Sequence, residues 1–244
     1  MKLHKTHYER GNRFGCLICG KLIIYSTESA VRICSICDSS FESNAVCESG
    51  HYICDGCHAS AQQDYLWLLR HTDEKNPVKL FSQIAALESV NMHGPEHHVI
   101  VPCVLLTAYR NSGGEIDLDA ALKVTVKRGA QVPGGICGFW GACGAAIGVG
   151  IYASVLTGSN PLNAEVWSVP QILTSRCLEE IAKVGGPRCC KRTSRIAIET
   201  AAQFTGERFG VQMPTADNQC DFYAYNKECL HGRCPYYGGH GNAV

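Results

Sequence analysis

The chain has 244 residues, no net formal charge and 16 cysteines. That length suits one or two domains and is sufficient to bury a hydrophobic core. Without net charge the chain lacks the overall positive field that attracts a polyanion or an acidic membrane, so we expect neither a nucleic-acid nor a membrane partner. The opening MKLHKTHYERGNRFGC contains no apolar signal segment, which favours a cytoplasmic protein that uses cysteine for metal or redox chemistry.

Seven cysteines and one histidine at the beginning of the chain have the spacing of metal ligands. They form four close pairs: Cys16 with Cys19, Cys34 with Cys37, Cys47 with His51, and Cys54 with Cys57. A close pair on a tight turn presents two ligands to one ion, and two pairs complete a tetrahedral shell. The sequence therefore predicts two zinc ions, each with a closed shell of protein ligands that is typical of a structural role.

The spacing leaves the pairing of these ligands open. A sequential arrangement joins the first two pairs in one site, whereas a crossed arrangement, as in RING-type fingers, joins the first pair to Cys47 and His51. His58 directly follows Cys57 and could replace a ligand. One zinc ion with free thiols, an iron–sulfur site and disulfides are the alternatives to two zinc ions.

After these ligands the pattern becomes helical. The segment ASAQQDYLWLLR at residues 59–70 has helical apolar spacing and precedes a polar stretch that ends in proline, so we place the first domain at residues 1–70. Further helices are predicted at residues 79–90, 97–111, 118–129, 170–184 and about 189–204, with Asp117 as a cap of the third. The predicted fold is mainly α: a helical bundle at residues 79–210, with a zinc-ribbon or RING-like module before it and an irregular cysteine-rich tail at residues 211–244.

Residues 129–164 contain no charged side chain. By length alone this stretch is a candidate for a transmembrane segment. Its many glycines and alanines and its moderate hydrophobicity favour instead a central helix buried in the bundle. Small residues such as Gly144 and Gly148 would let neighbouring backbones approach closely.

Nine cysteines lie beyond the N-terminal ligands. Cys103 and Cys177 have apolar helical neighbours and are expected in the core. Cys137 and Cys143 lie six residues apart at a glycine-rich helix start.

The dipeptide Cys189-Cys190 is flanked by Arg188 and Lys191 and lies just after Gly185-Gly186. Cations and a helix N-terminus both lower the pKa of a thiol, so reactive cysteines are expected here.

The tail carries Cys220, Cys229 and Cys234 in an aromatic and glycine-rich segment. Such a segment cannot build its own core, so it either coordinates a metal or packs on the bundle. Cysteine followed by proline, as at Cys234, also occurs among iron–sulfur ligands. One quartet of thiolates available for a [4Fe–4S] cluster combines bundle and tail: Cys143, Cys190, Cys229 and Cys234.

A pair of histidines, His97 and His98, begins a predicted helix after Gly94-Pro95-Glu96. Such a pair can bind metal or transfer protons near neutral pH. The alternative is a capped and solvated helix end.

Four segments together resemble an uncharacterised family, a domain of unknown function found in methanogenic archaea and anaerobic bacteria: GPEHHVIVPCVLLTAYRN, VPGGICGFWGACGAAIGVGIYASVLTG, GGPRCCKRTS and CDFYAYNKECLHGRCP. The resemblance covers roughly residues 10–238. More distantly, Cys103, the CGAA run at residues 143–146 and Cys189-Cys190 are similar in order to a redox-active family named for its Cys, Gly-Cys-Ala and two later cysteines. That family has glycine directly before the middle cysteine, whereas this chain has Ala142.

These features lead to one main hypothesis: a metal-binding protein of anaerobic metabolism with a cysteine-based redox or iron–sulfur site, acting in sulfur or electron transfer. Thiolate or cluster chemistry would belong to Cys137, Cys143, Cys189 and Cys190. Arg188 and Lys191 would stabilise the anionic forms, and His97 or His98 would transfer protons. The partner would be a small-molecule thiol or sulfur compound, or a protein redox partner.

Two other classes compete with this hypothesis. In a non-catalytic zinc adaptor, the cysteines of the bundle would be core residues or structural ligands. In a small-molecule-binding enzyme, the start of the glycine-rich helix would bind an anion.

Overall fold

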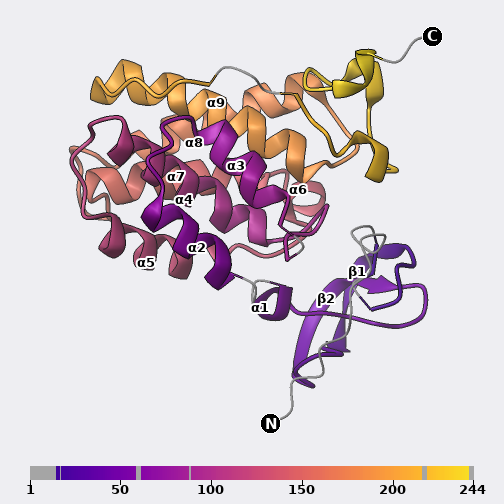
Figure 1. Ribbon diagram of the computed structural model, residues 1–244. Coiled ribbons are helices and arrows are strands. Elements are labelled where there is room, and N and C mark those ends of the chain that lie inside the picture. Colours follow the sequence, from indigo (N-terminus) through magenta and orange to yellow (C-terminus); the bar gives the residue numbers. More distant parts are fainter. Residues whose placement is uncertain (1–14, 17, 59–61, 88, 216–218, 242–244) are drawn as a thin grey trace.

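The computed structural model describes residues 15–16, 18–58, 62–87, 89–215 and 219–241. Figure 1 shows a small N-terminal part beside a larger helical domain. The N-terminal part, residues 15–58, is called the metal module below. It consists of an antiparallel hairpin of β1 (Ile23–Ile33) and β2 (Ser40–Cys47), followed by the short α1 (Asp55–His58).

The hairpin is a feature that the sequence did not predict. Its side chains are mostly exposed, so it lacks the alternation of apolar and polar residues that marks a half-buried strand. The buried cluster of the metal module is small and contains Cys34, Ile53 and Cys54. A module with so small a core needs other stabilisation, which metal ions at its cysteines would supply.

The rest of the chain is mainly helical, as predicted. The helices of this domain are α2 (Gln62–His71), α3 (Pro77–Ala85), α4 (Glu96–Asn111), α5 (Leu118–Gly129), α6 (Ile136–Phe139), α7 (Gly144–Thr157), α8 (Ser168–Val184) and α9 (Cys190–Phe209). Asp117 caps α5 as expected, because its Oδ1 accepts a hydrogen bond from the Ala120 N–H at 3.1 Å. The last helix continues five residues beyond its predicted end and stops before Gly210, whose φ of 70° ends it.

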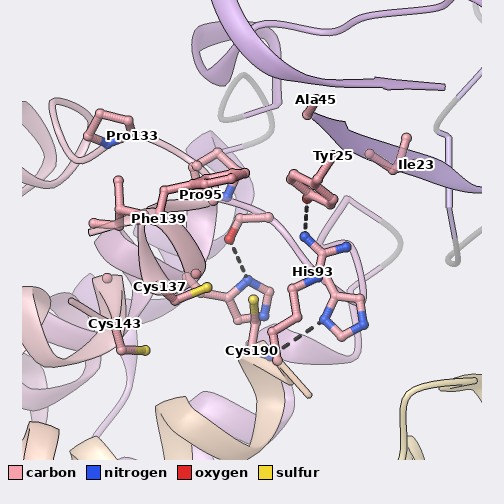
Figure 2. A pocket seen from close by; sticks show the side chains of 18 of the residues that line it. Ile23, Tyr25, Ala45, His93, Pro95, Pro133, Cys137, Phe139, Cys143 and Cys190 are labelled. Atoms are coloured by element: carbon pink, nitrogen blue, oxygen red, sulfur yellow. Dashed lines mark hydrogen bonds between the residues drawn. The ribbon is translucent and has the colours of Figure 1, made fainter. Parts of the chain in front are cut away.

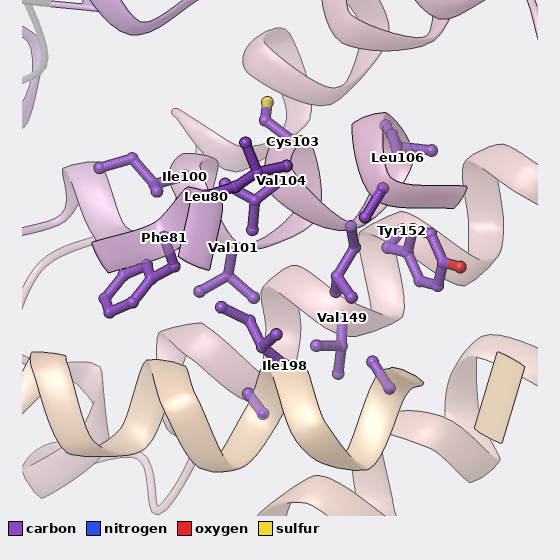
Figure 3. Packing of buried hydrophobic residues seen from close by; sticks show 14 of the residues in the cluster. Leu80, Phe81, Ile100, Val101, Cys103, Val104, Leu106, Val149, Tyr152 and Ile198 are labelled. Carbon is purple, nitrogen blue, oxygen red and sulfur yellow. The ribbon is translucent and has the colours of Figure 1, made fainter. Parts of the chain in front are cut away.

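A single apolar core holds these helices together around α4 (Figure 3). Side chains of α3, α7 and α9 pack on α4, and labelled examples are Phe81, Val149 and Ile198. Tyr65 and Leu69 of α2 belong to the same core, so α2 packs with the helical domain. Cys103 and Cys177 are fully buried there, which confirms them as core residues.

The charge-free stretch contributes two helices, α6 and α7. Buried residues lie on several sides of α7, as expected for a central helix. Gly148 permits a close approach to α4, because an added Cβ would lie 3.0 Å from Cδ of Pro102. Among the residues that the structure describes, no helix combines the length and hydrophobicity required to cross a bilayer.

The tail lies against α9 as a series of short turns (Figure 1), with 3-10 helices at Tyr223–Tyr225, His231–Arg233 and Gly238–Gly241. Phe222 of the tail is buried in the helical core. The Tyr236 hydroxyl donates a hydrogen bond to Oε2 of Glu199 on α9 at 2.6 Å. These contacts attach the tail to the helical domain.

Candidate metal centres and the adjoining cavity

The first group of metal ligands lies at the open end of the hairpin. Cys16 and Cys19 precede β1, Cys47 ends β2, and His51 follows in the next turn. Sγ of Cys19 lies 3.4 Å from Sγ of Cys47, and Nδ1 of His51 lies 3.7 Å from Sγ of Cys16. The four ligand atoms all lie within 4.8 Å of one another, so they can surround one ion.

The second group lies at the turn end of the hairpin. Cys34 and Cys37 come from the connection between β1 and β2, and Cys54 and Cys57 come from the segment at α1. Sγ of Cys37 lies 3.8 Å from Sγ of Cys54, and the four sulfur atoms again lie within 4.8 Å of one another.

Antiparallel pairing decides the ligand arrangement that the sequence left open. Because Ile23 pairs with Cys47, the end of β2 returns to the cysteines that precede β1. The crossed arrangement is therefore the one that the fold adopts. His58 belongs to neither group, and its Nδ1 lies 4.0 Å from Oε2 of Glu96.

Hydrogen bonds lower the pKa of two of these thiols, Cys47 and Cys34. Burial alone would raise the pKa of Cys47, but hydrogen bonds from the Ser49 N–H, at 3.2 Å, and from neighbouring ligands lower it to about 6. In the same way the Cys54 N–H, at 3.3 Å, helps to lower the pKa of Cys34 to about 6 against the effect of burial. Each group therefore contains one thiol that is deprotonated at neutral pH, whereas burial raises the pKa of Cys16 in the first group and of Cys54 in the second.

The residues present fit a tetrahedral soft metal ion. Each group supplies four sulfur or nitrogen donors, and zinc takes such donors at about 2.3 Å for sulfur and about 2.0 Å for nitrogen. The chain can thus hold two metal ions, and the donor sets are consistent with zinc. Four protein ligands leave no coordination position open for a substrate.

A cavity of about 880 Å³ lies between the metal module and the helical domain. This volume is in the range of small-molecule sites, about 300–1,000 Å³. Figure 2 shows hairpin residues on one side and helical-domain residues on the other. Labelled lining residues include Ile23, Tyr25, Ala45, Pro95, Pro133 and Phe139.

Five cysteines line this space. Cys16 belongs to the first metal-ligand group, and Cys189 also contacts the tail. The other three, which we call the cavity thiols, come from three elements of the helical domain. Cys137 lies in α6, Cys143 precedes α7, and Cys190 is the first residue of α9. Figure 2 shows them at one end of the cavity. The three thiols lie close enough to affect one another's pKa: negative charge on Cys143 raises the pKa of both Cys137 and Cys190.

The expected lowering of thiol pKa at the start of α9 is wrong. Burial raises the pKa of Cys190 to about 12, although Arg188 acts in the opposite direction. Burial also raises the pKa of Cys189, and partial loss of hydration raises that of the more exposed Cys137. Loss of hydration therefore outweighs the nearby cations and the helix terminus, and these thiols are protonated at neutral pH.

His97 and His98 are buried beside the cavity thiols, so the alternative of a solvated helix end is wrong. Nδ1 of His97 lies 3.1 Å from the Gly94 carbonyl, and Nδ1 of His98 lies 2.9 Å from the Val132 carbonyl. A carbonyl only accepts, so each Nδ1 carries the hydrogen and each Nε2 is left as an acceptor. Nε2 of His97 has no hydrogen-bond partner among the described residues.

The two cations near Cys190 differ in their surroundings. Arg188 lines the cavity, donates a hydrogen bond to the Tyr25 hydroxyl and lies 4.8 Å from the centre of the Tyr25 ring. Lys191 is buried and donates a hydrogen bond to the Asn91 carbonyl at 2.9 Å. Arg188 is thus placed to interact with a molecule in the cavity. The Lys191 ammonium group instead points to the connection between α3 and α4.

Sequence reasoning missed His93 and Tyr25. The Cys190 N–H points to Nδ1 of His93 at 3.5 Å, and Nε2 of His93 lies 3.3 Å from Oε2 of Glu228. His93 is 97 residues from Cys190 in the chain, and no spacing signal joins the two. Tyr25 lies in the hairpin that the sequence did not predict.

The structure distributes the quartet expected for an iron–sulfur cluster over two places. Cys143 and Cys190 line the cavity, whereas Cys229 and Cys234 lie in the tail. Cys189 is directed toward the tail, since its Sγ accepts a hydrogen bond from Nδ2 of Asn226 at 3.4 Å.

Comparison with known proteins places the helical domain and tail in a family. A family model described as a family of unknown function, DUF5714, matches residues 67–237. The chain belongs to this family. No curated protein and no solved structure matches it. The DUF5714 segment contains all the cavity thiols, and both metal-ligand groups lie before it.

Proposed function

We propose that this DUF5714 protein is a zinc-stabilised thiol protein that carries out redox chemistry on a small sulfur compound in the cavity. The observation that supports the proposal is the convergence of Cys137, Cys143 and Cys190 on one cavity of ligand size. The two four-ligand groups would hold zinc and fix the hairpin that forms the opposite wall.

The reaction proposed is thiol–disulfide exchange with a small-molecule disulfide. Cys137 is the exposed cavity thiol, so its sulfur would attack the disulfide, form a mixed disulfide and release one thiol. A second cavity thiol, Cys143 or Cys190, would then attack the mixed disulfide and release the other thiol. The substrate gains two electrons and two protons, and the protein is left with one internal disulfide.

Protonated thiols need a proton acceptor before they react. The unprotonated Nε2 atoms of His97 and His98 supply acceptors beside the cavity thiols. Burial lowers the pKa of both His98 and His97, so both imidazoles are neutral at pH 7 and keep an unprotonated Nε2.

The test uses the full-length zinc-loaded chain and bis(2-hydroxyethyl) disulfide under anaerobic conditions. Peptide mapping by mass spectrometry should find an internal disulfide between two cavity thiols. The Cys137→Ser variant should form it much more slowly, whereas Cys177→Ser, a core control, should behave as the wild type. Reaction confined to the cysteines of the metal module would contradict the proposal.

A non-catalytic zinc adaptor is the second candidate, supported by a different observation. The hairpin exposes several large apolar side chains, among them Val31, Ile33 and Phe41. Such a surface is typical of protein contacts. An adaptor would keep its partner affinity when all three cavity thiols are replaced by serine, whereas the thiol protein would lose disulfide formation.

A further inference from the structure

The tail brings its three cysteines together through backbone hydrogen bonds. The Cys220 N–H donates to the Tyr236 carbonyl at 2.7 Å, which holds Cys220 beside the segment that follows Cys234. The Cys234 N–H donates to the His231 carbonyl at 2.7 Å and closes the turn that joins Cys234 to the Cys229 region. The tail therefore presents Cys220, Cys229 and Cys234 from one compact fold.

Asn226 connects a fourth cysteine to this group. Its buried side chain donates from Nδ2 to Sγ of Cys189 at 3.4 Å, and its backbone carbonyl accepts from the Cys229 N–H at 3.0 Å. Oδ1 of the same side chain accepts from the Glu228 N–H at 3.0 Å. The hydrogen bonds of Asn226 thus connect Cys189, at the start of α9, to the turn that carries Cys229.

The charges of these four cysteines also affect one another's pKa. Burial raises the pKa of Cys189, and negative charge on Cys220 and Cys234 raises it further. Burial also raises the pKa of Cys220, and negative charge on Cys234 and Cys229 raises it further. Such charge effects fall off with distance, so the four thiols lie near one another.

We propose that Cys189, Cys220, Cys229 and Cys234 bind an iron–sulfur cluster. This quartet differs from the one expected from the sequence, because Cys189 and Cys220 replace the cavity thiols Cys143 and Cys190. It is independent of the disulfide chemistry proposed for the cavity.

The four sulfur atoms, as the described part of the chain places them, do not closely surround a single ion. In the metal module the ligands of each group lie within 4.8 Å of one another, but that limit does not unite these four cysteines among the described residues. A cluster of several iron and sulfide ions holds its ligand sulfurs farther apart than one ion does. A single zinc ion is therefore not the cofactor that this arrangement favours.

Other contacts match the needs of an anionic cluster. The His231 N–H donates to Sγ of Cys229 at 3.3 Å, and hydrogen bonds of this kind stabilise and tune clusters. The buried cations Arg192 and Arg195 lower the pKa of Cys189 and Cys220, respectively, and oppose the effect of burial. The positive charge of the two arginines would offset the negative charge of the cluster.

The first experiment measures metal content in the full-length chain. Protein purified anaerobically after incubation with iron and sulfide should contain about four iron and about four sulfide per chain and absorb broadly in the visible. Its zinc content should equal the two sites of the metal module. A colourless protein, or one with a third zinc ion in place of iron, would overturn the proposal.

Variants then identify the ligands. Cys220→Ser should lose the iron and the visible absorbance, whereas the matched cavity variant Cys143→Ser should keep both. Unchanged zinc content and far-UV circular dichroism would show that Cys220→Ser is folded outside the tail. Loss of iron in Cys143→Ser with retention in Cys220→Ser would assign the cluster to the cavity and overturn the proposal.

A measurement on the wild-type chain avoids any folding defect of a variant. Alkylation followed by peptide mapping should find the four proposed ligands protected when iron is bound and reactive after iron is removed by a chelator. Cys137 should react in both states, since it is exposed. Equal alkylation of the four cysteines with and without iron would contradict their role as ligands.

Discussion

Cys189 and Cys190 are consecutive residues that both line the cavity, and Cys189 also contacts the tail. Sγ of Cys189 accepts a hydrogen bond from Nδ2 of Asn226 in the tail at 3.4 Å. The first turn of α9 therefore joins the tail cysteines to the cavity thiols. A cluster held by Cys189 would lie one residue from a cavity thiol.

The first prediction concerns the open end of the hairpin. His51→Ala removes one of four ligands from the first group, so the metal content should fall from about two ions to about one per chain. His58→Ala is the matched control, because His58 belongs to neither group and should leave two ions bound. Metal analysis checks both variants. A loss of metal in His58→Ala alone would contradict the ligand assignment.

Local spacing explains why some features could be predicted from the sequence. The metal ligands occur as close pairs on turns, so their chemistry is visible before any fold is known. The helix at α4 and the Asp117 cap of α5 are also local, since periodicity and capping involve residues within a few positions. The choice between sequential and crossed ligand pairing depends on strand pairing, and the sequence left it open.

Long-range contacts and burial explain what could not be predicted. His93 meets the Cys190 backbone only because the segment before α4 packs against the start of α9. The neighbouring cations Arg188 and Lys191 and the helix N-terminus predicted a lowered pKa for Cys190. Burial instead raises it to about 12, and the extent of burial follows from the tertiary fold. The tail similarly meets Cys189 through Asn226, a contact without a spacing signal.

A second prediction follows from the buried imidazole of His98. Burial lowers the folded-state pKa of His98 below the usual 6.5, while Asp55 acts in the opposite direction. The unfolded chain therefore binds the extra proton first, and stability present above pH 6.5 is lost as the pH falls, at up to about 1.4 kcal/mol per pH unit. His98→Gln should flatten this dependence in urea unfolding between pH 7.5 and 5.

The exposed His71 provides the control for that measurement. His71→Gln should keep the wild-type slope, because the substitution leaves His98 and its buried surroundings unchanged. Release of metal at low pH is common to all three proteins and cancels in the comparison. Equal slopes for His98→Gln and wild type would show that His98 makes no contribution.

A third prediction tests the packing of α7 beside the cavity. A Cβ added at Gly144 would overlap the imidazole of His98, which is held by its hydrogen bond to the Val132 carbonyl. Gly144→Ala should therefore lower the free energy of unfolding by about 1–3 kcal/mol. Gly138→Ala in α6 has open space around the new methyl group and should be neutral or slightly stabilising. Equal unfolding midpoints for the two variants in urea would disprove the overlap.

The last prediction concerns the contact between the metal module and the helical domain. Arg188 donates a hydrogen bond to the Tyr25 hydroxyl and lies over the Tyr25 ring, and a cation–π contact at a partly exposed site is worth about 1 kcal/mol. Arg188→Ala removes both interactions, so the module should separate more often from the helical domain. Tyr25→Phe keeps the ring and should have a smaller effect.

Small-angle X-ray scattering can follow this separation, because it increases the radius of gyration. The increase should be largest for Arg188→Ala, smaller for Tyr25→Phe and absent for Lys183→Ala, whose ammonium group pairs with the exposed Glu180 at 2.7 Å within α8. A larger increase for Tyr25→Phe than for Arg188→Ala would mean that the hydroxyl holds the module through another partner. Identical scattering for all variants would mean that the remaining contacts around the cavity suffice to hold the module in place.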